Sequence, residues 1–392
     1  MRNNFQHPLM ENNITNDDKK ELINFIKKSD RFTNGPKVKE FEKKWSRWLG
    51  VKYSIFVNSG SSANLLSLAD LKIRKGEGEV IVPPLTWSSD IFALIHNNFK
   101  PVFVDINLKT LGIDENEIEK KISKKTKAIF LTHVLGLNAL TNKILNLCKK
   151  YKIELIEDCC ESHGAKFRGK KIGSFGHQSN FSFYYAHHMS TIEGGMISTN
   201  SIETYRNLRM LRSHGMVREC DSKKIKLFYQ KKYPKLNKDF IFAFPSYNVR
   251  STELNAQLGI SQLKRLNKNN IIRCNNFKYF LSQLDKKKFY TDFNILGSVN
   301  YALILILNKN VSNFKNRKKL EKIMNDNAIE FRRGLSGGGD QTQQPYFRDL
   351  IKNKNLNLNV IKHVHNYSYY IGNYPSLTKN KIEKICKILN QI

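Results

Sequence analysis

Short apolar runs alternate with amphipathic segments over the first 250 residues of the chain. Seven runs have the length and side chains of buried strands, at residues 53–57, 79–83, 101–106, 127–133, 153–157, 179–185 and 196–199. Helical periodicity lies between several of them, at residues 63–69, 88–96, 115–122 and 142–149. This alternation predicts an open α/β sheet covered by helices, in which ligands bind at the carboxyl ends of the strands.

The pattern changes after about residue 250, where lysine- and asparagine-rich segments interrupt the periodicity. We expect helices at residues 251–265, 313–325 and 379–389, a strand at 300–307 and a glycine-rich loop at 336–339. The sequence therefore predicts a large domain over residues 1–250, with an N-terminal arm, and a smaller α+β domain over residues 251–392.

The chain is strongly basic, with 66 Lys and Arg against 34 Asp and Glu and a net charge of +32. Such a charge is typical of proteins that bind nucleic acid. Here the basic residues are mostly lysines spread along the chain, without zinc-finger spacing, an RNP1 signature or a basic-zipper heptad. We therefore expect solvated lysine-rich faces, no nucleic-acid partner and a positive field that favours an anionic substrate.

Other compositional signals are weak. No apolar run approaches the ~18 residues of a membrane span, and the opening residues lack the apolar segment of a secretory signal. The six cysteines show neither CxxC spacing nor a secreted disulfide pattern. We therefore expect a soluble cytoplasmic protein with no membrane partner, free thiols and no metal site.

A serine-rich turn follows the first predicted strand. It reads NSGSSA over residues 58–63 and leads into an apolar helix. Free N–H groups and the helix dipole at such a turn favour an anion, and Ser61 and Ser62 would donate to a phosphate. Ordinary helix capping explains the same residues, so both interpretations stay open for this motif alone.

Two carboxyl groups follow the predicted strand 153–157. Asp158 and Glu161 are three residues apart and would share one face if the turn is helical. An acid at this end of a strand can pair with a protonated ring nitrogen. Capping of a helix is the alternative for Asp158.

A third block, FSFYYAHHMSTIEGGM, occupies residues 181–196. Together with the two earlier motifs, it resembles the fold-type I, pyridoxal-phosphate-dependent sugar aminotransferases of the DegT/DnrJ/EryC1/StrS group. The resemblance covers nearly the whole chain and includes further blocks in order, at residues 86–87 (TW), 212–215 (RSHG), 246–253 (SYNVRSTE) and 258–259 (LG). It implies an aspartate-aminotransferase-like large domain with a mostly parallel sheet of about seven strands, beside the smaller α+β domain.

The resemblance also implies a cofactor site, residue by residue. Trp87 resembles the aromatic that stacks on the pyridine ring, and Asp158 the carboxylate that pairs with the ring nitrogen. Glu161 lies where the family usually has glutamine or another polar group near the ring hydroxyl. Asn248 resembles the residue that reaches the phosphate from the partner subunit, which implies a homodimer with shared active sites. The other implied phosphate contacts are Gly60, Ser61 and Ser182.

The chain departs from the family at the position that attaches the cofactor. The aminotransferases have a lysine that binds the cofactor covalently, six residues before the Glu of the EGG block. Counted from Glu193, this position is His187, followed by His188, and no lysine occurs between Lys171 and Lys223. Imidazole does not form this attachment but moves protons near neutral pH. The pattern resembles the sugar 3-dehydratase branch of the family, with His187 as catalytic residue and His188 as the alternative in register.

The resemblance implies a dehydratase with non-covalent pyridoxal 5′-phosphate and pyridoxamine 5′-phosphate. The substrate would be a nucleotide-linked 4-keto-6-deoxy sugar, by resemblance a GDP-sugar, which loses its C3 hydroxyl. L-Glutamate would be the amino donor, and the 3,6-dideoxy product would serve surface polysaccharides such as lipopolysaccharide or capsule. The alternatives are a nucleotide-sugar aminotransferase that uses another lysine, and a non-catalytic cofactor or nucleic-acid binder.

Four further positions have two interpretations each. His214 would assist at the substrate or only pack, and Arg250 would clamp a carboxylate of glutamate or form an interface ion pair. Arg332 and Arg333, in the loop 332–345, would meet substrate phosphates or lie on the surface. A related branch uses a four-cysteine iron–sulfur cluster; only three widely spread cysteines follow His187, so we expect no cluster.

Overall fold

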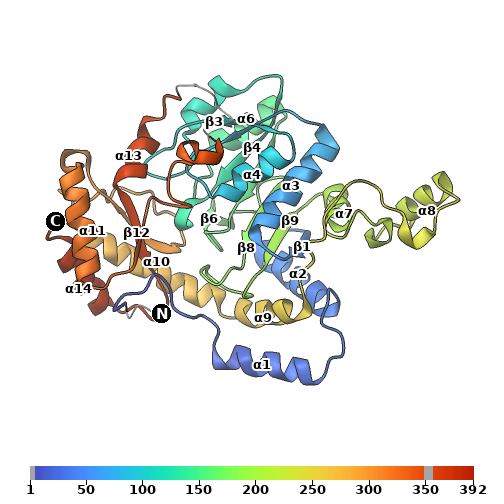
Figure 1. Cartoon of the computed structure of the whole chain (residues 1–392), viewed down its shortest axis with the longest axis horizontal. Helices are drawn as coiled ribbons and strands as arrows, with labels where there is room; N and C mark the ends of the chain where they lie inside the picture. The colour runs from blue at the N-terminus through green and yellow to red at the C-terminus, as the bar shows by residue number, and fades with distance from the viewer. Residues whose placement is uncertain (1–4, 348–355) are drawn as a thin grey trace.

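The computed structural model describes residues 5–347 and 356–392 (Figure 1). Its centre is a seven-stranded sheet in the order β1–β9–β8–β5–β4–β2–β3. The strands are β1 (Tyr53–Val57), β2 (Glu79–Val82), β3 (Lys100–Phe103), β4 (Thr126–Thr132), β5 (Glu154–Asp158), β8 (Gln178–Ser182) and β9 (Gly195–Thr199). Strand β9 is antiparallel to β1 and β8, and the other pairings are parallel. The mostly parallel sheet predicted from the sequence is confirmed.

Alternation of side chains along the strands produces a layer of helices on each face. Val80 and Phe130 pack in one apolar cluster with residues of α3 (Gly60–Lys75) and α4 (Ser88–His96). Their neighbours Ile81 and Ile129 pack on the opposite face with α6 (Asn142–Tyr151) and the short α5 (Glu115–Ile118). Successive residues of a strand point to opposite faces, so a strand buried on both sides is apolar throughout. The short pair β6 (Lys166–Phe167) and β7 (Lys170–Lys171) lies outside this sheet.

Helix α2 (Pro36–Leu49) closes the sheet near β8 and β9. It buries Phe41 and Trp45 completely, and the Trp45 ring meets the rings of Phe181 and Phe183 edge-on, at centroid distances of 4.9 Å each. Helix α9 (Glu253–Leu263) packs beside it. These contacts hold the segment that follows β8, which carries the two adjacent histidines.

The C-terminal part forms a second, antiparallel sheet in the order β10–β12–β11. Its elements are β10 (Ala302–Ile306), β11 (Phe331–Arg333), β12 (Ser368–Gly372), α10 (Leu266–Gln283), α11 (Phe314–Asp326), α13 (Asn359–Tyr367) and α14 (Lys379–Leu389). One apolar cluster joins Leu303 and Ile371 of this sheet to Leu85 and Leu135 of the central region. The smaller α+β region is therefore present, and the apolar interior is continuous between the two parts.

Helix α10 was not expected from the sequence, because polar residues occupy its buried face. Asn270, Arg273 and Asn276 are buried there together with Phe277. The Asn270 amide donates to the carbonyl of His163 at 2.7 Å, and the Arg273 guanidinium donates to the carbonyl of Asn373. Hydrogen bonds of this kind offset the cost of burying polar groups. Because several buried positions are polar, the sequence of this segment does not show the regular spacing of apolar residues that predicts a helix.

Two segments extend from the body of the molecule (Figure 1). Helix α1 (Asn16–Lys27) packs on α9, and the chain before it pairs with the C-terminal part through His7 and Ile329. The segment after α7 (Ile202–Leu211) projects at the right of the view and contains α8 (Lys223–Lys232). Its exposed apolar side chains are Leu227, Phe228, Tyr233, Leu236, Phe240 and Phe242.

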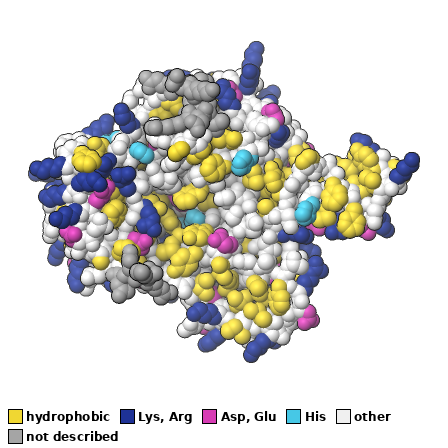
Figure 2. Space-filling model, in the orientation of Figure 1, with side chains coloured by type: hydrophobic (Ala, Val, Ile, Leu, Met, Phe, Trp, Pro, Cys, Tyr) yellow, Lys and Arg dark blue, Asp and Glu magenta, His cyan; other side chains and the backbone are white. Residues whose placement is uncertain are grey.

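Lysine and arginine side chains are scattered around the edge of the visible face and form no single patch there (Figure 2). This distribution agrees with the solvated lysine faces expected from the sequence. Within residues 5–347 and 356–392, no helix combines the length and the hydropathy required to cross a bilayer.

The carboxylate of Glu253 caps helix α2, whose N-terminal Gly35 has no side chain to do so. It accepts hydrogen bonds from the backbone N–H groups of Gly35, Lys37 and Val38 at 3.1, 2.9 and 2.8 Å. Replacement Glu253→Gln puts an NH2 group against these donors. We expect it to lower the free energy of unfolding by about 1–3 kcal/mol in urea titrations.

The control for this prediction is Glu203→Gln. Glu203 is exposed in the first turn of α7, where it makes the same charge–dipole interaction without these bonds. Equal small effects of both variants would show that the Glu253 cap contributes nothing beyond the dipole.

Candidate active site

A cavity of about 460 Å³ lies at the edge of the central sheet. The carboxyl ends of β1, β4, β5 and β8 meet there, because these strands run in the same direction. Side chains from the C-terminal part, among them Tyr301, Arg332 and Tyr370, complete its walls. The position is the one expected for a ligand site in an open α/β sheet.

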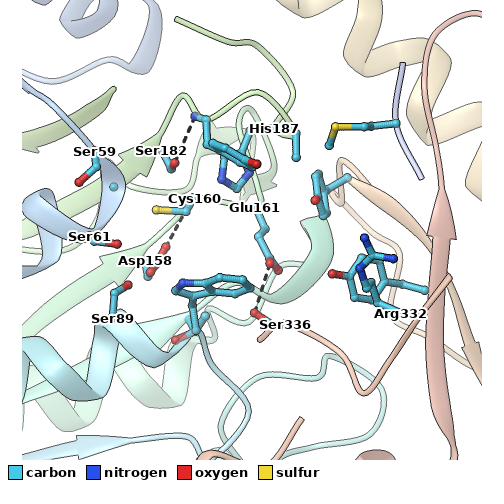
Figure 3. Close-up of a pocket in the computed structure, with 18 of the residues that line it drawn as sticks. Ser59, Ser61, Ser89, Asp158, Cys160, Glu161, Ser182, His187, Arg332 and Ser336 are labelled. Atoms are coloured by element: carbon cyan, nitrogen blue, oxygen red, sulfur yellow. Dashed lines mark hydrogen bonds between the residues drawn. The ribbon is translucent and has the colours of Figure 1, made fainter. Parts of the chain in front are cut away.

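One end of the cavity is lined by serines and by the first turn of α3 (Figure 3). Ser59 caps this helix and accepts from the N–H of Ser62 at 3.0 Å, while Ser61 and Ser182 face the cavity. The N–H groups of a first helical turn have no partner within the helix and carry the positive end of its dipole. This end of the cavity is therefore suited to a phosphate.

Two glycines permit the close packing around this turn. A Cβ atom on Gly60 would lie 2.5 Å from the Cβ of Ser182, and one on Gly195 would lie 2.1 Å from the carbonyl oxygen of Ser59. Gly195, the second glycine of the EGG block, therefore lets β9 approach the helix end. Ser62, by contrast, donates to Asn58 and does not line the cavity, so its predicted phosphate role is wrong for the side chain.

Asp158 lies at the floor of the cavity, at the end of β5. Its carboxylate accepts from the backbone N–H of Cys160 at 2.8 Å and from the amide of Asn64 at 3.2 Å. The chain continues as turns and not as a helix, so the helix-cap alternative and the shared helical face with Glu161 are both wrong. The two carboxyls nevertheless reach the same cavity.

Glu161 is fixed between two loops. It accepts from the N–H of Leu135 at 2.8 Å and from the hydroxyl of Ser336 at 3.2 Å (Figure 3). Burial raises the pKa of Glu161 to about 7, with a further contribution from the charge of Asp158. Near neutral pH this group can therefore either donate or accept a proton.

His187 faces the cavity, and His188 does not. The ring of His187 lies 5.6 Å from that of Tyr301, and its buried Nδ1 has no hydrogen-bond partner. His188 bonds instead to the carbonyl of Val299 at 2.9 Å. Burial, with help from the charge of Arg273, lowers the pKa of His187 to about 4, against the opposing charge of Asp158. Its imidazole is therefore neutral at physiological pH and can act as a base.

Trp87 lines the cavity where α4 begins and is half-exposed. A large aromatic that remains exposed beside a cavity is suited to stacking on a planar ligand. The loop around Gly337 packs against its indole ring.

The far end of the cavity was largely missed by sequence reasoning. It contains Leu9 and Met10 from the N-terminal segment, and Glu330, Arg332 and Tyr370 from the C-terminal sheet. Arg332 lies opposite the serines (Figure 3) and forms an ion pair with Glu330 at 3.2 Å. These residues are remote in sequence and belong to no motif, although Arg332 was named in the loop 332–345.

Three predicted site residues lie outside the cavity of this single chain. Arg250 pairs with Val57 at the end of β1, and its guanidinium donates to the Asn248 side chain at 3.0 Å, while His214 is exposed nearby. The backbone N–H of Asn58 donates to the carbonyl of Val249 at 3.0 Å, which places this segment beside the serine turn. Roles for these three residues remain predictions.

A buried group, His133, Glu157 and Cys159, has metal-ligand chemistry. The Glu157 carboxylate already accepts from the backbone N–H groups of Gly173, Phe175 and Gly176, at 2.8, 3.1 and 2.7 Å. The Glu157 carboxylate is therefore satisfied by backbone donors, and this group has the contacts of a structural network beside the cavity.

Known proteins resemble this chain over nearly its full length. The model of the DegT/DnrJ/EryC1/StrS aminotransferase family matches residues 13–390. GDP-4-keto-6-deoxy-D-mannose 3-dehydratase of Escherichia coli O55:H7 is 32% identical over 377 residues, which cover 94% of this chain and 96% of the relative.

Solved structures agree. E. coli GDP-4-keto-6-deoxy-D-mannose-3-dehydratase with bound hydrated PLP has a TM-score of 0.89 at 28% identity and covers 98% of this chain and 99% of that one. A GDP-4-keto-6-deoxymannose-3-dehydratase with a trapped PLP-glutamate geminal diamine has a TM-score of 0.88 at 29% identity, with coverages of 98% and 100%. The predictions of family and fold are therefore confirmed.

The environment of His187 predicts an unusual titration. In the cofactor-free protein, we expect the 13Cε1 signal of His187 to titrate with a pKa of about 4, below the ordinary value of 6.5, because charging a buried imidazole is unfavourable. The base form therefore persists as the pH falls through 6.5. The NMR signal is assigned by its loss in His187→Gln, and the urea-unfolded protein is the reference. A pKa near 6.5 in the folded protein would contradict this site geometry.

Proposed function

Since the chain belongs to the DegT/DnrJ/EryC1/StrS aminotransferase family, we propose that it removes the C3 hydroxyl of a GDP-linked 4-keto-6-deoxy sugar as a pyridoxal 5′-phosphate-dependent 3-dehydratase. The product is a 4-keto-3,6-dideoxy sugar for surface polysaccharide biosynthesis. The observation that carries this proposal is the imidazole of His187 at the family's lysine position. No lysine lines the cavity in the part of the chain that the structure describes.

The cavity residues suit the cofactor. The first turn of α3, Ser61 and Ser182 would hold the phosphate, Trp87 would cover the ring, and Asp158 would face the ring nitrogen. Glu161 would lie near the ring hydroxyl. The cofactor supplies an amine for the sugar ketone and an electron sink when its ring nitrogen is protonated.

His187 is the proton carrier in this proposal. With the cofactor and sugar bound, its neutral imidazole would take a proton from the C4′ carbon of the cofactor and would give it to the departing C3 oxygen of the sugar. A lysine at this position would compete with water for the aldehyde carbon of the cofactor. Imidazole does not react there, so water would release the sugar by hydrolysis. The sugar therefore loses one oxygen, and the amine nitrogen leaves as ammonia.

L-Glutamate restores the amine form of the cofactor and leaves as 2-oxoglutarate. The related structure with a PLP-glutamate adduct supports this choice of donor. Arg332 at the far end and Arg250 beside the serine turn are the candidates to bind carboxylate or diphosphate groups. The GDP moiety is proposed because two relatives of this chain are GDP-4-keto-6-deoxy-D-mannose 3-dehydratases.

We further propose a homodimer in which Asn248 reaches the phosphate of the partner's site. Asn248 lies outside its own cavity and pairs with Ser213, so these two residues bracket the segment that contains α8. The exposed apolar side chains of that segment are suited to burial against a second copy.

Mass spectrometry of a mixture of GDP-4-keto-6-deoxymannose, the protein, the cofactor and glutamate tests the function. We expect the sugar to lose one oxygen atom while ammonia and 2-oxoglutarate form in equal amounts. An amino sugar that retains its C3 oxygen would instead identify an aminotransferase. No sugar product, with salt-sensitive DNA binding, would identify the non-catalytic alternative.

Replacement of His187 separates binding from proton transfer. We expect His187→Asn to lower the rate of dehydration by at least about 100-fold, since one acid–base group contributes roughly 10²–10⁴. Cofactor affinity, measured by absorbance titration, should change by less than about threefold. His188→Asn is the neighbouring control, and a larger loss there would move the catalytic role to His188.

A further inference from the structure

A second carboxyl group, Asp90, lies beside Asp158 and has no role in the reaction proposed above. It belongs to α4, is completely buried and does not line the cavity. The amide nitrogen of Asn64 contacts both acids, at 2.6 Å from Oδ1 of Asp90 and 3.2 Å from Oδ2 of Asp158. The same nitrogen lies 3.3 Å from the hydroxyl of Ser89. An amide has two hydrogens, so three acceptors compete for them.

The hydroxyl oxygens around Asp90 indicate where a proton resides. Thr86 Oγ1 and Thr132 Oγ1 lie 2.7 Å apart, and both are within hydrogen-bond distance of Oδ2 of Asp90, Thr132 at 3.1 Å. These three oxygens form three mutual contacts, but two hydroxyls supply only two hydrogens. A proton on Asp90 supplies the third and satisfies the triangle.

Electrostatics favours the same assignment. Burial raises the pKa of Asp90 well above its ordinary value, and the adjacent charge of Asp158 raises it further. The thiol of Cys160 lies close to the same charges, and burial raises its pKa as well. Two carboxyls in one dry site do not both ionise. Asp158 accepts a backbone N–H and faces the cavity, so it is the one suited to hold the negative charge.

We propose that Asp90 is a positioning residue for the cofactor. As a neutral acid bonded to Thr86 and Thr132, it leaves Asp158 as the single negative charge facing the ring nitrogen, and through Asn64 it fixes the orientation of that carboxylate. This inference rests on the proposed function, because it requires Asp158 to meet the ring nitrogen. It predicts that an amide can replace the Asp90 carboxyl and that a shorter side chain cannot.

The test uses full-length protein loaded with pyridoxal 5′-phosphate that carries 15N in the ring. The nitrogen chemical shift distinguishes the protonated from the unprotonated ring without any turnover. We expect the wild type and Asp90→Asn to show the protonated signal, with cofactor affinities within about threefold of each other. Asp90→Ala and Asp90→Ser should weaken cofactor binding at least about tenfold, the equivalent of about 1.4 kcal/mol, and move the signal toward the unprotonated form.

Two results would overturn the proposal. Loss of the protonated signal in Asp90→Asn would show that an ionised Asp90 is needed. Unchanged signal and affinity in the folded Ala and Ser variants would show that Asp90 only packs. Thermal unfolding of each cofactor-free variant confirms that it is folded, and Asp90→Asn decides the question if both truncated variants are unfolded.

A matched variant separates this inference from the proposed function. Asp158→Asn should abolish the protonated signal if Asp158 meets the ring nitrogen. If that signal persists, the role of Asp158 is wrong whatever Asp90 does. If the protonated signal disappears in Asp158→Asn while the Asp90 variants contradict the proposal, only the positioning role of Asp90 is wrong.

Discussion

Burial in and beside the cavity shifts the pKa of three groups on which the proposed chemistry depends, His187, Glu161 and Asp90. Desolvation is the largest cause of each shift: it lowers the pKa of His187, with a smaller contribution from the charge of Arg273, and it raises the pKa of Glu161 and Asp90, to which the charge of Asp158 adds. A water-filled cleft would leave these groups near their ordinary values, with a partly charged imidazole and fully ionised carboxyls. In the proposed reaction, these buried groups would provide a neutral base, an acid that titrates near neutral pH and a single carboxylate for the cofactor ring.

The sheet makes this burial possible. Four strands end at one edge, and the start of α3 and the C-terminal sheet close the space above them. The glycines at 60 and 195 let the helix end, β8 and β9 pack without room for a side chain. Helix α10 contributes Arg273 to the surroundings of His187. Among the described residues, the guanidinium of Arg273 donates to the backbone carbonyls of Tyr301 and Asn373 and to no acid. These hydrogen bonds therefore do not neutralise the positive charge of Arg273 near His187.

Much of this architecture could be predicted from the sequence, because buried strands and short connecting helices have a strong local signal. All seven strands of the main sheet were located from apolar runs. Ser61, Asp158 and Glu161 were identified from motifs at the ends of predicted strands, and Ser182 and His187 from the family resemblance. The structure brings all five into one cavity. Helix α10 was missed because Asn and Arg interrupt the apolar residues of its buried face. Tyr301, Glu330 and Tyr370 were missed because only the tertiary fold brings them to the cavity. Asp90 lies within the predicted helix 88–96, and no sequence pattern indicates that it packs beside Asp158.

Borohydride reduction followed by intact-protein mass spectrometry distinguishes a non-covalent cofactor from one bound to lysine most directly. The wild-type protein, saturated with pyridoxal 5′-phosphate and then reduced, should keep the mass of the bare chain, because histidine makes no reducible bond to the cofactor. His187→Lys provides the positive control, with one pyridoxyl group at residue 187. One stoichiometric pyridoxyl group on any lysine of the wild-type chain would contradict the dehydratase mechanism and favour an aminotransferase.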